Sequence, residues 1–229
     1  MSVVETDRVA ALRDAESKAV QLFDEAVRRG LVVPGITERQ LSDEIRDLAN
    51  EMFGVRKFWH KRIVRSGVNT LEPYRSNPAE LTLESDDIVF FDFGPIFSEW
   101  EADVGRTYVL GDDEHKHRLA ADLPVIWAAG RDHFAATPEI TGDELFAYVL
   151  GLMGERGWGH GARHAGHLVG EFPHERVEDD QVTSYITPGS HQPMRRPDAA
   201  GNPCHWILEV HLTDRERGFG GFFEQLLDL

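Results

Sequence analysis

Short runs of β-forming hydrophobic residues recur along the chain, and each is interrupted by one acidic or imidazole side chain. The runs occupy residues 87–95, 100–110, 166–175, 205–212 and 220–227. Their content of Val, Ile, Leu and Phe, bounded by Gly or Pro, predicts β-strands. The side chains that interrupt them are Asp92, Asp103, His167, Glu209 and Glu224. Because charged side chains are rarely buried without a partner, these five are candidates for one functional site.

The first two runs are typical of a hairpin. Residues 94–99 connect them, and neighbouring antiparallel strands would place Asp92 and Asp103 side by side, within reach of a common ligand. The alternative is that Asp103 pairs with Arg106 while Asp92 faces solvent.

Histidines gather around the third run. His167 and His174 both lie in it, and His160 and His164 precede it. A single His is usually structural or exposed, whereas a cluster near acidic residues is more often a metal or catalytic site. Four carboxylates in one pocket would repel one another and raise their pKa values, and divalent cations placed among them relieve that repulsion. The pattern therefore predicts a metal site if the runs converge.

The chain also contains a degenerate internal repeat. Residues 34–41 resemble residues 138–145, and both copies begin a helix with a capping box. The capping pairs are Thr37 with Gln40 and Thr141 with Glu144. Each copy follows a long helix, predicted at about 6–30 and about 115–136. The repeat would place Asp92 and Glu209 in corresponding strands, and Asp103 and Glu224 in the next. Coincidence of a short, common motif is the alternative.

Composition narrows the class of protein. The 229 residues, 41% of them hydrophobic, can bury a large core as a single domain over residues 1–229. No run approaches the roughly 18 apolar residues of a membrane helix, and the first residues lack a signal-sequence pattern. The single cysteine, Cys204, excludes an internal disulfide, so we expect a cytoplasmic protein with no membrane partner. A net charge of −16 argues against a nucleic-acid partner.

The order and spacing of the motifs resemble the pita-bread metallopeptidase superfamily, which includes methionine aminopeptidase, aminopeptidase P, prolidase and the metal-free creatinase. Asp92-Phe-Gly and residues 103–107 (Asp-Val-Gly-Arg-Thr) match its first two ligand motifs, and residues 167–175 match its His-x-x-Gly-x-x-x-His-Glu motif. The resemblance covers nearly the whole chain. It implies an α+β pita-bread fold of two pseudo-symmetric αβ halves with a curved antiparallel sheet, without the N-terminal domain of creatinase-type members.

The resemblance also implies two divalent metal ions, for which Mn, Co, Fe and Zn all suit an oxygen-rich site with one imidazole. The implied ligands are Asp92, Asp103, His167, Glu209 and Glu224. Asp103 and Glu224 would bridge the ions, Asp92 would complete one site, and His167 with Glu209 the other. His174 would stabilise the oxyanion of the reaction, so His174 and Glu209 are the candidate catalytic residues.

The substrate side departs from the family pattern. Residues 65–75 resemble the family's Ser-Gly-x-Asn loop, in which Asn69 lies on the substrate-amine side. The peptidases carry a substrate-contacting His where this chain has Tyr74, and a Tyr does not carry protons near neutral pH. His60 is the nearest upstream alternative for that contact. Phe222 stands where prolidase-like members often carry Arg.

The resemblance therefore implies a metal-dependent hydrolase, first of all an Xaa-Pro-type aminopeptidase or dipeptidase that acts on small peptides with a water activated by the two metals. The departures leave open a metal-dependent enzyme acting on a C–N or C–C bond of a small non-peptide substrate such as an amide. A peptide-binding module without chemistry is the third hypothesis. Residues 176–203, rich in Asp, Ser, Pro and Gly, are interpreted as a surface loop, a substrate-selecting lid or a homodimer contact.

Overall fold

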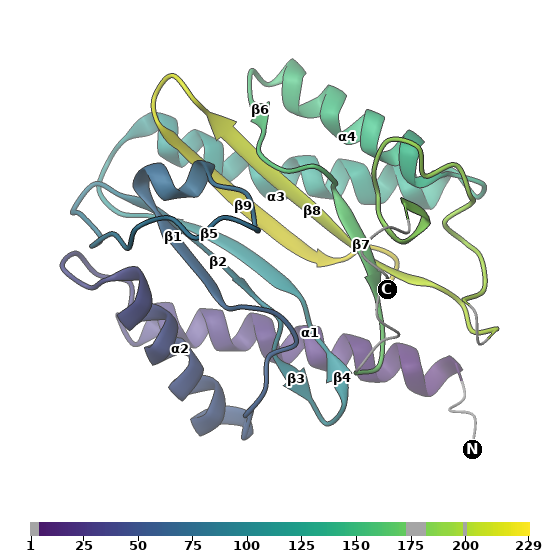
Figure 1. Cartoon of the computed structure of the whole chain (residues 1–229), viewed down its shortest axis with the longest axis horizontal. Helices are drawn as coiled ribbons and strands as arrows, with labels where there is room; N and C mark the ends of the chain where they lie inside the picture. The colour runs from purple at the N-terminus through teal and green to yellow at the C-terminus, as the bar shows by residue number, and fades with distance from the viewer. Residues whose placement is uncertain (1–4, 173–181, 199–200) are drawn as a thin grey trace.

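The computed structural model describes residues 5–172, 182–198 and 201–229. Figure 1 shows the helices and strands that these residues form. The helices are α1 (Glu5–Arg28), α2 (Glu38–Phe53), α3 (Glu114–Ala136) and α4 (Gly142–Glu155), with short 3-10 turns η1 (Gly67–Leu71) and η2 (Val182–Ser184). The two long helices expected from the sequence correspond to α1 and α3.

One seven-stranded sheet forms the centre of the molecule. Its spatial order is β1 (Ile63–Ser66), β2 (Ile88–Phe93), β5 (Val104–Val109), β9 (Phe219–Leu226), β8 (His205–Asp214) and β6 (Gly159–His160), and β7 (Gly166–Val169) also pairs with β8. Every pairing in the sheet is antiparallel. The predicted α+β class is therefore confirmed.

The sheet divides into two similar halves at the contact between β5 and β9, where Gly105 pairs with Glu224. The β1-β2-β5 group follows α1 and α2, and the group of β6 to β9 follows α3 and α4. Both predicted capping boxes are present, on Thr37 at the start of α2 and on Thr141 at the start of α4. Equivalent caps before equivalent strand groups confirm the predicted pseudo-symmetric halves.

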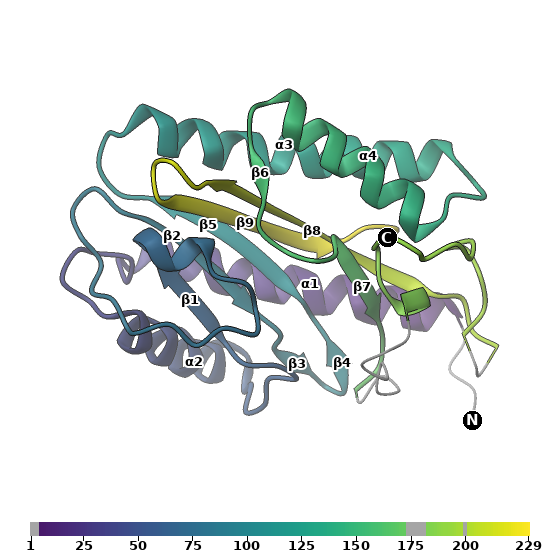
Figure 2. The ribbon, with the colours of Figure 1, turned by 45° about the horizontal axis from the view of Figure 1, so that its top comes forward.

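Each half has its own hydrophobic core. Phe23 of α1 packs its ring against Phe91 and Phe93 of β2, with centroids 5.3 and 5.6 Å apart. In the second half, α3 and α4 enclose a core that includes Trp127 and Leu208, joined by a hydrogen bond of 3.1 Å from the indole to the Leu208 carbonyl. Figure 2 shows each helix pair lying along its own half of the sheet. The helices thus cover one face of the sheet, and the acidic residues Asp92, Glu209 and Glu224 project from the other.

The predicted hairpin is present, but its connection is more elaborate than a turn. Ile96–Phe97 (β3) and Trp100–Glu101 (β4) form a small hairpin of their own between β2 and β5. The turn between them places Ser98 and Glu99 at φ values of 49° and 82°. Because residues other than Gly rarely adopt positive φ, this turn could not be expected from its residue types. The second predicted strand accordingly starts at Val104 instead of Trp100.

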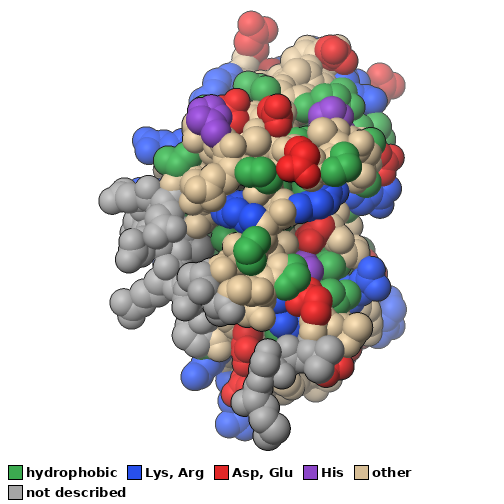
Figure 3. All heavy atoms as spheres, turned by 90° about the vertical axis from the view of Figure 1, so that its right-hand side faces the viewer, with side chains coloured by type: hydrophobic (Ala, Val, Ile, Leu, Met, Phe, Trp, Pro, Cys, Tyr) green, Lys and Arg blue, Asp and Glu red, His purple; other side chains and the backbone are tan. Residues whose placement is uncertain are grey.

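On the face seen in Figure 3, acidic and basic side chains lie next to one another, with no continuous positive area among the described residues. In the same described part of the chain, every helix is too short or too polar to cross a bilayer.

Candidate metal centre

Strand register brings the acidic residues together in one row across the sheet. Asp92 of β2 lies opposite Gly105 of β5, Gly105 lies opposite Glu224 of β9, and Glu224 lies opposite Glu209 of β8. Directly opposed residues in antiparallel strands project from the same face, so the three carboxylates share it. Gly105 contributes no side chain to the row. A Cβ there would lie 2.4 Å from the Phe222 ring, so the row requires Gly at this point.

Asp103 joins the row from just before β5. This residue and Asp92, Glu209 and Glu224 are all less than a tenth exposed. Arg106 hydrogen-bonds instead to the carbonyls of Gly105 and Glu224 and to Gln225. The alternative in which Arg106 neutralises Asp103 and Asp92 faces solvent is therefore excluded.

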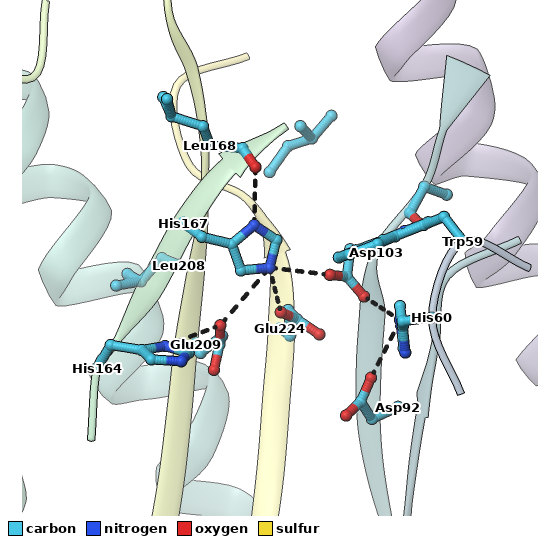
Figure 4. Close-up of polar contacts among 12 residues, drawn as sticks. Trp59, His60, Asp92, Asp103, His164, His167, Leu168, Leu208, Glu209 and Glu224 are labelled. Carbon is cyan, nitrogen blue, oxygen red and sulfur yellow. Dashed lines mark hydrogen bonds and ion pairs between the residues drawn. The ribbon is translucent and has the colours of Figure 1, made fainter. Parts of the chain in front are cut away.

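His167 of β7 completes the group from the second half. Its Nε2 lies 3.1 Å from Oδ2 of Asp103, 3.8 Å from Oε1 of Glu209 and 3.9 Å from Oε1 of Glu224. Its Nδ1 donates a 2.7 Å hydrogen bond to the carbonyl of Leu168, which fixes the ring and directs Nε2 at the carboxylates. Figure 4 shows the two halves presenting these side chains to one another. The five predicted residues therefore do converge.

A second imidazole, His60, faces the other side of Asp103. Its Nε2 lies 3.1 Å from Oδ1 of Asp103 and 3.5 Å from Oδ1 of Asp92. Its Nδ1 donates to the Lys61 carbonyl at 2.7 Å, the same arrangement as in His167. Asp103 is thus held between two imidazoles, one from each half.

The segment that carries His60 is tied to the end of β2. Trp59 N donates to the Gly94 carbonyl at 2.9 Å, and the Trp59 indole donates to the Ala102 carbonyl at 3.0 Å. A Cβ on Gly94 would lie 2.3 Å from both the His60 and the Trp59 side chains. Gly94 of the Asp-Phe-Gly motif therefore allows His60 to approach the acids.

Burial and the close approach of like charges shift the pKa values of the residues in the cluster. Burial, together with the charges of Asp103 and Glu209, raises the pKa of Glu224 well above its usual value. Burial also raises the pKa of Asp92 to about 7, against the effect of nearby His60. Burial alone would lower the pKa values of His60 and His167, but the surrounding carboxylates, Asp103 foremost, raise both to about 9. Without metal, protons supply the compensating positive charge.

The described residues contain two groups of donors that could each hold a metal ion. Two groups have one potential ligand atom from each residue within 4.8 Å of the others: His60 with Asp92 and Asp103, and Asp103 with His167 and Glu224. Asp103 belongs to both groups, so its carboxylate would be shared if both groups held an ion. Oε2 of Glu224 is buried and lacks a hydrogen-bond partner among the described residues, which leaves a lone pair for a ligand. Carboxylate oxygens with imidazole nitrogens suit Mn, Co, Fe or Zn.

His164 is a neighbour of the cluster that the sequence pattern did not single out as a site residue. Its Nδ1 lies 3.4 Å from Oε1 of Glu209. Burial acts to raise the pKa of Glu209, but His164 brings it below the usual value. The only signal in the sequence was its place in the His cluster. More distant His211 donates through Nε2 to the Thr70 carbonyl, 2.8 Å away, and burial lowers its pKa to about 4.

A sequence model of metallopeptidase family M24 matches residues 10–199 of this chain. The chain belongs to metallopeptidase family M24. The Xaa-Pro dipeptidases of Pyrococcus horikoshii and Pyrococcus furiosus are 28% and 29% identical to this family member over 161 residues. Each of these matches covers 69% of the chain and 45% of the relative, so the chain spans about half the length of the curated relatives it matches.

Solved structures of two peptidases share the fold of this chain. A prolidase from Thermococcus sibiricus has a TM-score of 0.73 at 22% identity, covering 98% of this chain and 56% of that one. A methionine aminopeptidase from Rickettsia prowazekii has a TM-score of 0.71 at 16% identity, covering 99% of this chain and 94% of that one. The pita-bread fold expected from the sequence is therefore confirmed.

The expected substrate-side residues of this M24 member differ in what they contact. Tyr74 is 46% exposed, and its ring lies edge-on to His60. Asn69 is buried, and its amide donates to both carboxylate oxygens of Glu38 at 3.1 and 3.0 Å and to the Ala79 carbonyl at 2.9 Å. These contacts give the Asn69 side chain a role in holding the loop. His174 lies outside the described residues.

Proposed function

We propose that this chain is a metallopeptidase that hydrolyses short peptides of the Xaa-Pro kind at two divalent ions. The proposed ligands are Asp92, Asp103, His167, Glu209 and Glu224. The observation that carries the proposal is the position of Asp103, whose two oxygens face two separate groups of donors. When bound, two such ions lower the pKa of a water between them and polarise the carbonyl to be attacked.

The side chains of this chain would have distinct tasks. Asp103 and Glu224 are proposed to hold both ions, because Asp103 is common to both donor groups and Glu224 lies in the same row. Glu209 is proposed to bind metal and to exchange a proton with the reacting groups, since its neighbour His164 keeps it ionised. His174 is proposed to donate a hydrogen bond to the oxyanion.

The substrate-side loop is proposed to be fixed through Glu38. The Glu38 carboxylate accepts from the Ser66 backbone N–H at 2.7 Å and from the Asn69 amide. Asn69 is therefore a positioning residue in this proposal, and His60 and Tyr74 are the side chains that would meet the substrate.

A second candidate is a metal-dependent enzyme that cleaves a C–N or C–C bond of a small non-peptide substrate. The observation in its favour is that Tyr74 lies beside His60 at the position expected to contact the substrate. Burial raises the pKa of the Tyr74 phenol above its usual value, so this side chain does not exchange a proton near neutral pH. In both candidates the metal site is the same, so metal content alone does not separate them.

The test is to load the purified protein with Mn(II) or Co(II), measure metal by elemental analysis, and assay a panel of dipeptides, tripeptides and small amides. We expect about two ions per chain and cleavage of Xaa-Pro peptides. A metal-loaded preparation that cleaves small amides but no peptide would replace the first candidate by the second. A chain that retains no metal would overturn both.

A further inference from the structure

A groove of about 560 Å³ opens beside the carboxylate cluster. The charged side chains that line the groove are positive, whereas those of the cluster are mainly carboxylates. It is lined by Phe172 and by residues of the 56–62 segment, among them His60. Since Nε2 of His60 lies 3.1 Å from Asp103, one side chain borders both the groove and the proposed metal centre. A peptide bound across the centre would therefore have this groove within reach.

Four of the groove's lining side chains are cationic: Arg56, Lys57, Lys61 and Arg62. No Asp or Glu lines it among the described residues. Such a concentration is notable in a chain that carries 40 acidic and only 24 basic residues, because basic side chains distributed at random would usually have acidic neighbours.

Two of the four cationic side chains already interact with other residues of the protein. Lys61 donates to the Ser76 carbonyl at 3.0 Å and lies over the Tyr74 ring, 4.7 Å from its centroid. Arg62 forms an ion pair of 2.9 Å with Asp43. Arg56 and Lys57, by contrast, are exposed and form no ion pair within the described residues.

The wall that carries Arg56 and Lys57 is held in place by backbone contacts. Ile96 N donates to the Lys57 carbonyl at 3.1 Å, and Phe58 forms a β-bridge with Pro95. The next residue, Trp59, is hydrogen-bonded to Gly94 and Ala102. The backbone of Lys57, and with it that of the adjacent Arg56, is thereby held next to the end of β2, which carries Asp92.

We propose that this groove is a substrate subsite that binds a carboxylate of the peptide through Arg56 and Lys57. The inference rests on the proposed peptidase function. The chain carries a net charge of −16 that repels an acidic substrate, and cations along one wall of the groove offset that repulsion and orient the substrate. The carboxylate belongs either to the free C-terminus of a dipeptide or to an acidic side chain, and both present the same two oxygens to the groove.

The experiment compares three peptides that begin with the same two residues: Ala-Pro, Ala-Pro amide and Ala-Pro-Glu amide. The test variant is Arg56→Gln with Lys57→Gln, which removes two charges and touches none of the proposed ligands. The matched control is Arg13→Gln with Arg215→Gln, which removes two exposed charges outside the groove. Binding is measured by calorimetry, and KM and kcat are measured separately on the manganese-loaded protein.

We expect the groove variant to bind the carboxylate-bearing peptide about tenfold more weakly, with a matching rise in KM, an unchanged kcat and no effect on Ala-Pro amide. Its remaining affinity should also depend less on salt than that of the wild type. Weaker binding of Ala-Pro alone would identify the terminal carboxylate as the group that the groove binds. Weaker binding of Ala-Pro-Glu amide would identify the Glu side chain of the peptide instead. Equal effects on all three peptides, or the same loss in the control variant, would overturn the subsite.

The proposed function can fail separately. If no peptide is cleaved but calorimetry still distinguishes acid from amide in the wild type and not in the variant, the peptidase hypothesis fails and the carboxylate subsite stands. If all three peptides are cleaved with the same KM by wild type and variant, the subsite is wrong and the peptidase hypothesis stands.

Discussion

The ring of Tyr74 lies edge-on to the imidazole of His60, with 5.9 Å between the ring centroids. Tyr74, where the family resemblance leads one to expect a histidine, thus meets an imidazole that comes from a different segment of the chain. His60 also lies within 3.1 Å of Asp103. The two residues together give the rim an imidazole and a phenol where the family pattern has one histidine.

The first prediction concerns this pair. Changing His60→Ala should lower kcat/KM for Xaa-Pro peptides by about 10² or more, because it removes the imidazole that faces Asp92 and Asp103. Tyr74→His should keep or increase turnover. Steady-state kinetics on metal-loaded protein provide the measurement, and Tyr74→Phe is the control for loss of the hydroxyl alone. Full activity of His60→Ala would remove His60 from the reaction.

The second prediction concerns Asp103. Asp103→Ala should lose both metal ions, because the carboxylate belongs to both donor groups. Glu224→Ala should do the same, and His167→Ala should lose mainly one ion. Elemental analysis after gel filtration measures occupancy, with exposed Asp112→Asn as the control for a removed charge. Two ions retained by Asp103→Ala would exclude a bridging role.

The third prediction concerns His174. If it acts on the oxyanion, His174→Ala should reduce kcat by about 10² while metal content stays at the wild-type level. Steady-state kinetics and elemental analysis of the same preparation are both needed, because together they distinguish a role in catalysis from a role in metal binding. Loss of an ion in this variant would make His174 a ligand instead.

The fourth prediction is a proton release on metal binding. At pH 7 the pKa values of about 9 leave His60 and His167 protonated in the metal-free protein, and the pKa of Glu224 is raised well above its usual value by burial and the nearby carboxylates. Ligands bind metal in their deprotonated forms, so binding should expel about two or more protons and its affinity should rise as pH increases from about 6 toward 9. Calorimetry in two buffers of different ionisation enthalpy counts the protons. Equal enthalpies in both buffers would contradict the cationic metal-free cluster.

The stability of the metal-free protein should fall as pH rises, whereas metal affinity should increase. His60 and His167 have folded-state pKa values near 9, above the usual 6.5, so their contribution to stability is complete at low pH and is lost as pH rises through about 9. The raised pKa of Asp92, about 7, acts in the same direction because the folded state binds more protons than the unfolded state. Thermal melts of apo protein should therefore shift downward between about pH 6 and 9.

The fifth prediction concerns the loop that Glu38 organises. Glu38→Ala leaves the Ser66 N–H and the Asn69 amide without their acceptor in a buried place. We expect a loss of about 2 to 4 kcal/mol in the free energy of unfolding, from two or more unsatisfied donors. Urea unfolding measures it, and Glu51→Ala on the exposed surface of α2 is the control, with little change expected. A Glu38→Ala protein as stable as the control would show that the loop does not depend on this carboxylate.

Sequence patterns were sufficient to predict the strands and helix starts that depend on residues close together in the chain. The runs around Asp92 and Glu209 predicted strands because the residues on both sides of each acid are apolar and β-forming. The boxes at Thr37 and Thr141 predicted helix starts because capping acts within four residues. The strand register then placed the acids in one row, which the spacing of residues could only suggest.

What the sequence did not reveal depends on contacts between distant segments. His60 reaches Asp103 across 43 positions because Phe58 bridges to Pro95 and Trp59 bonds to Gly94. The motif predicted Asn69 on the substrate side, but it gave no sign that Glu38, 31 positions away, accepts a hydrogen bond from its amide. The β3-β4 turn uses positive φ at Ser98 and Glu99, for which residue type gives no sign.

The division of the donors between the two halves has a consequence for assembly. A chain cut between β5 and α3 would leave His60, Asp92 and Asp103 on one fragment and His167, Glu209 and Glu224 on the other. The first fragment keeps one donor group and the second keeps neither, so only a reassembled pair of fragments would capture two ions. Mixing separately prepared fragments and following metal uptake would therefore report directly on whether the halves recognise each other across β5 and β9.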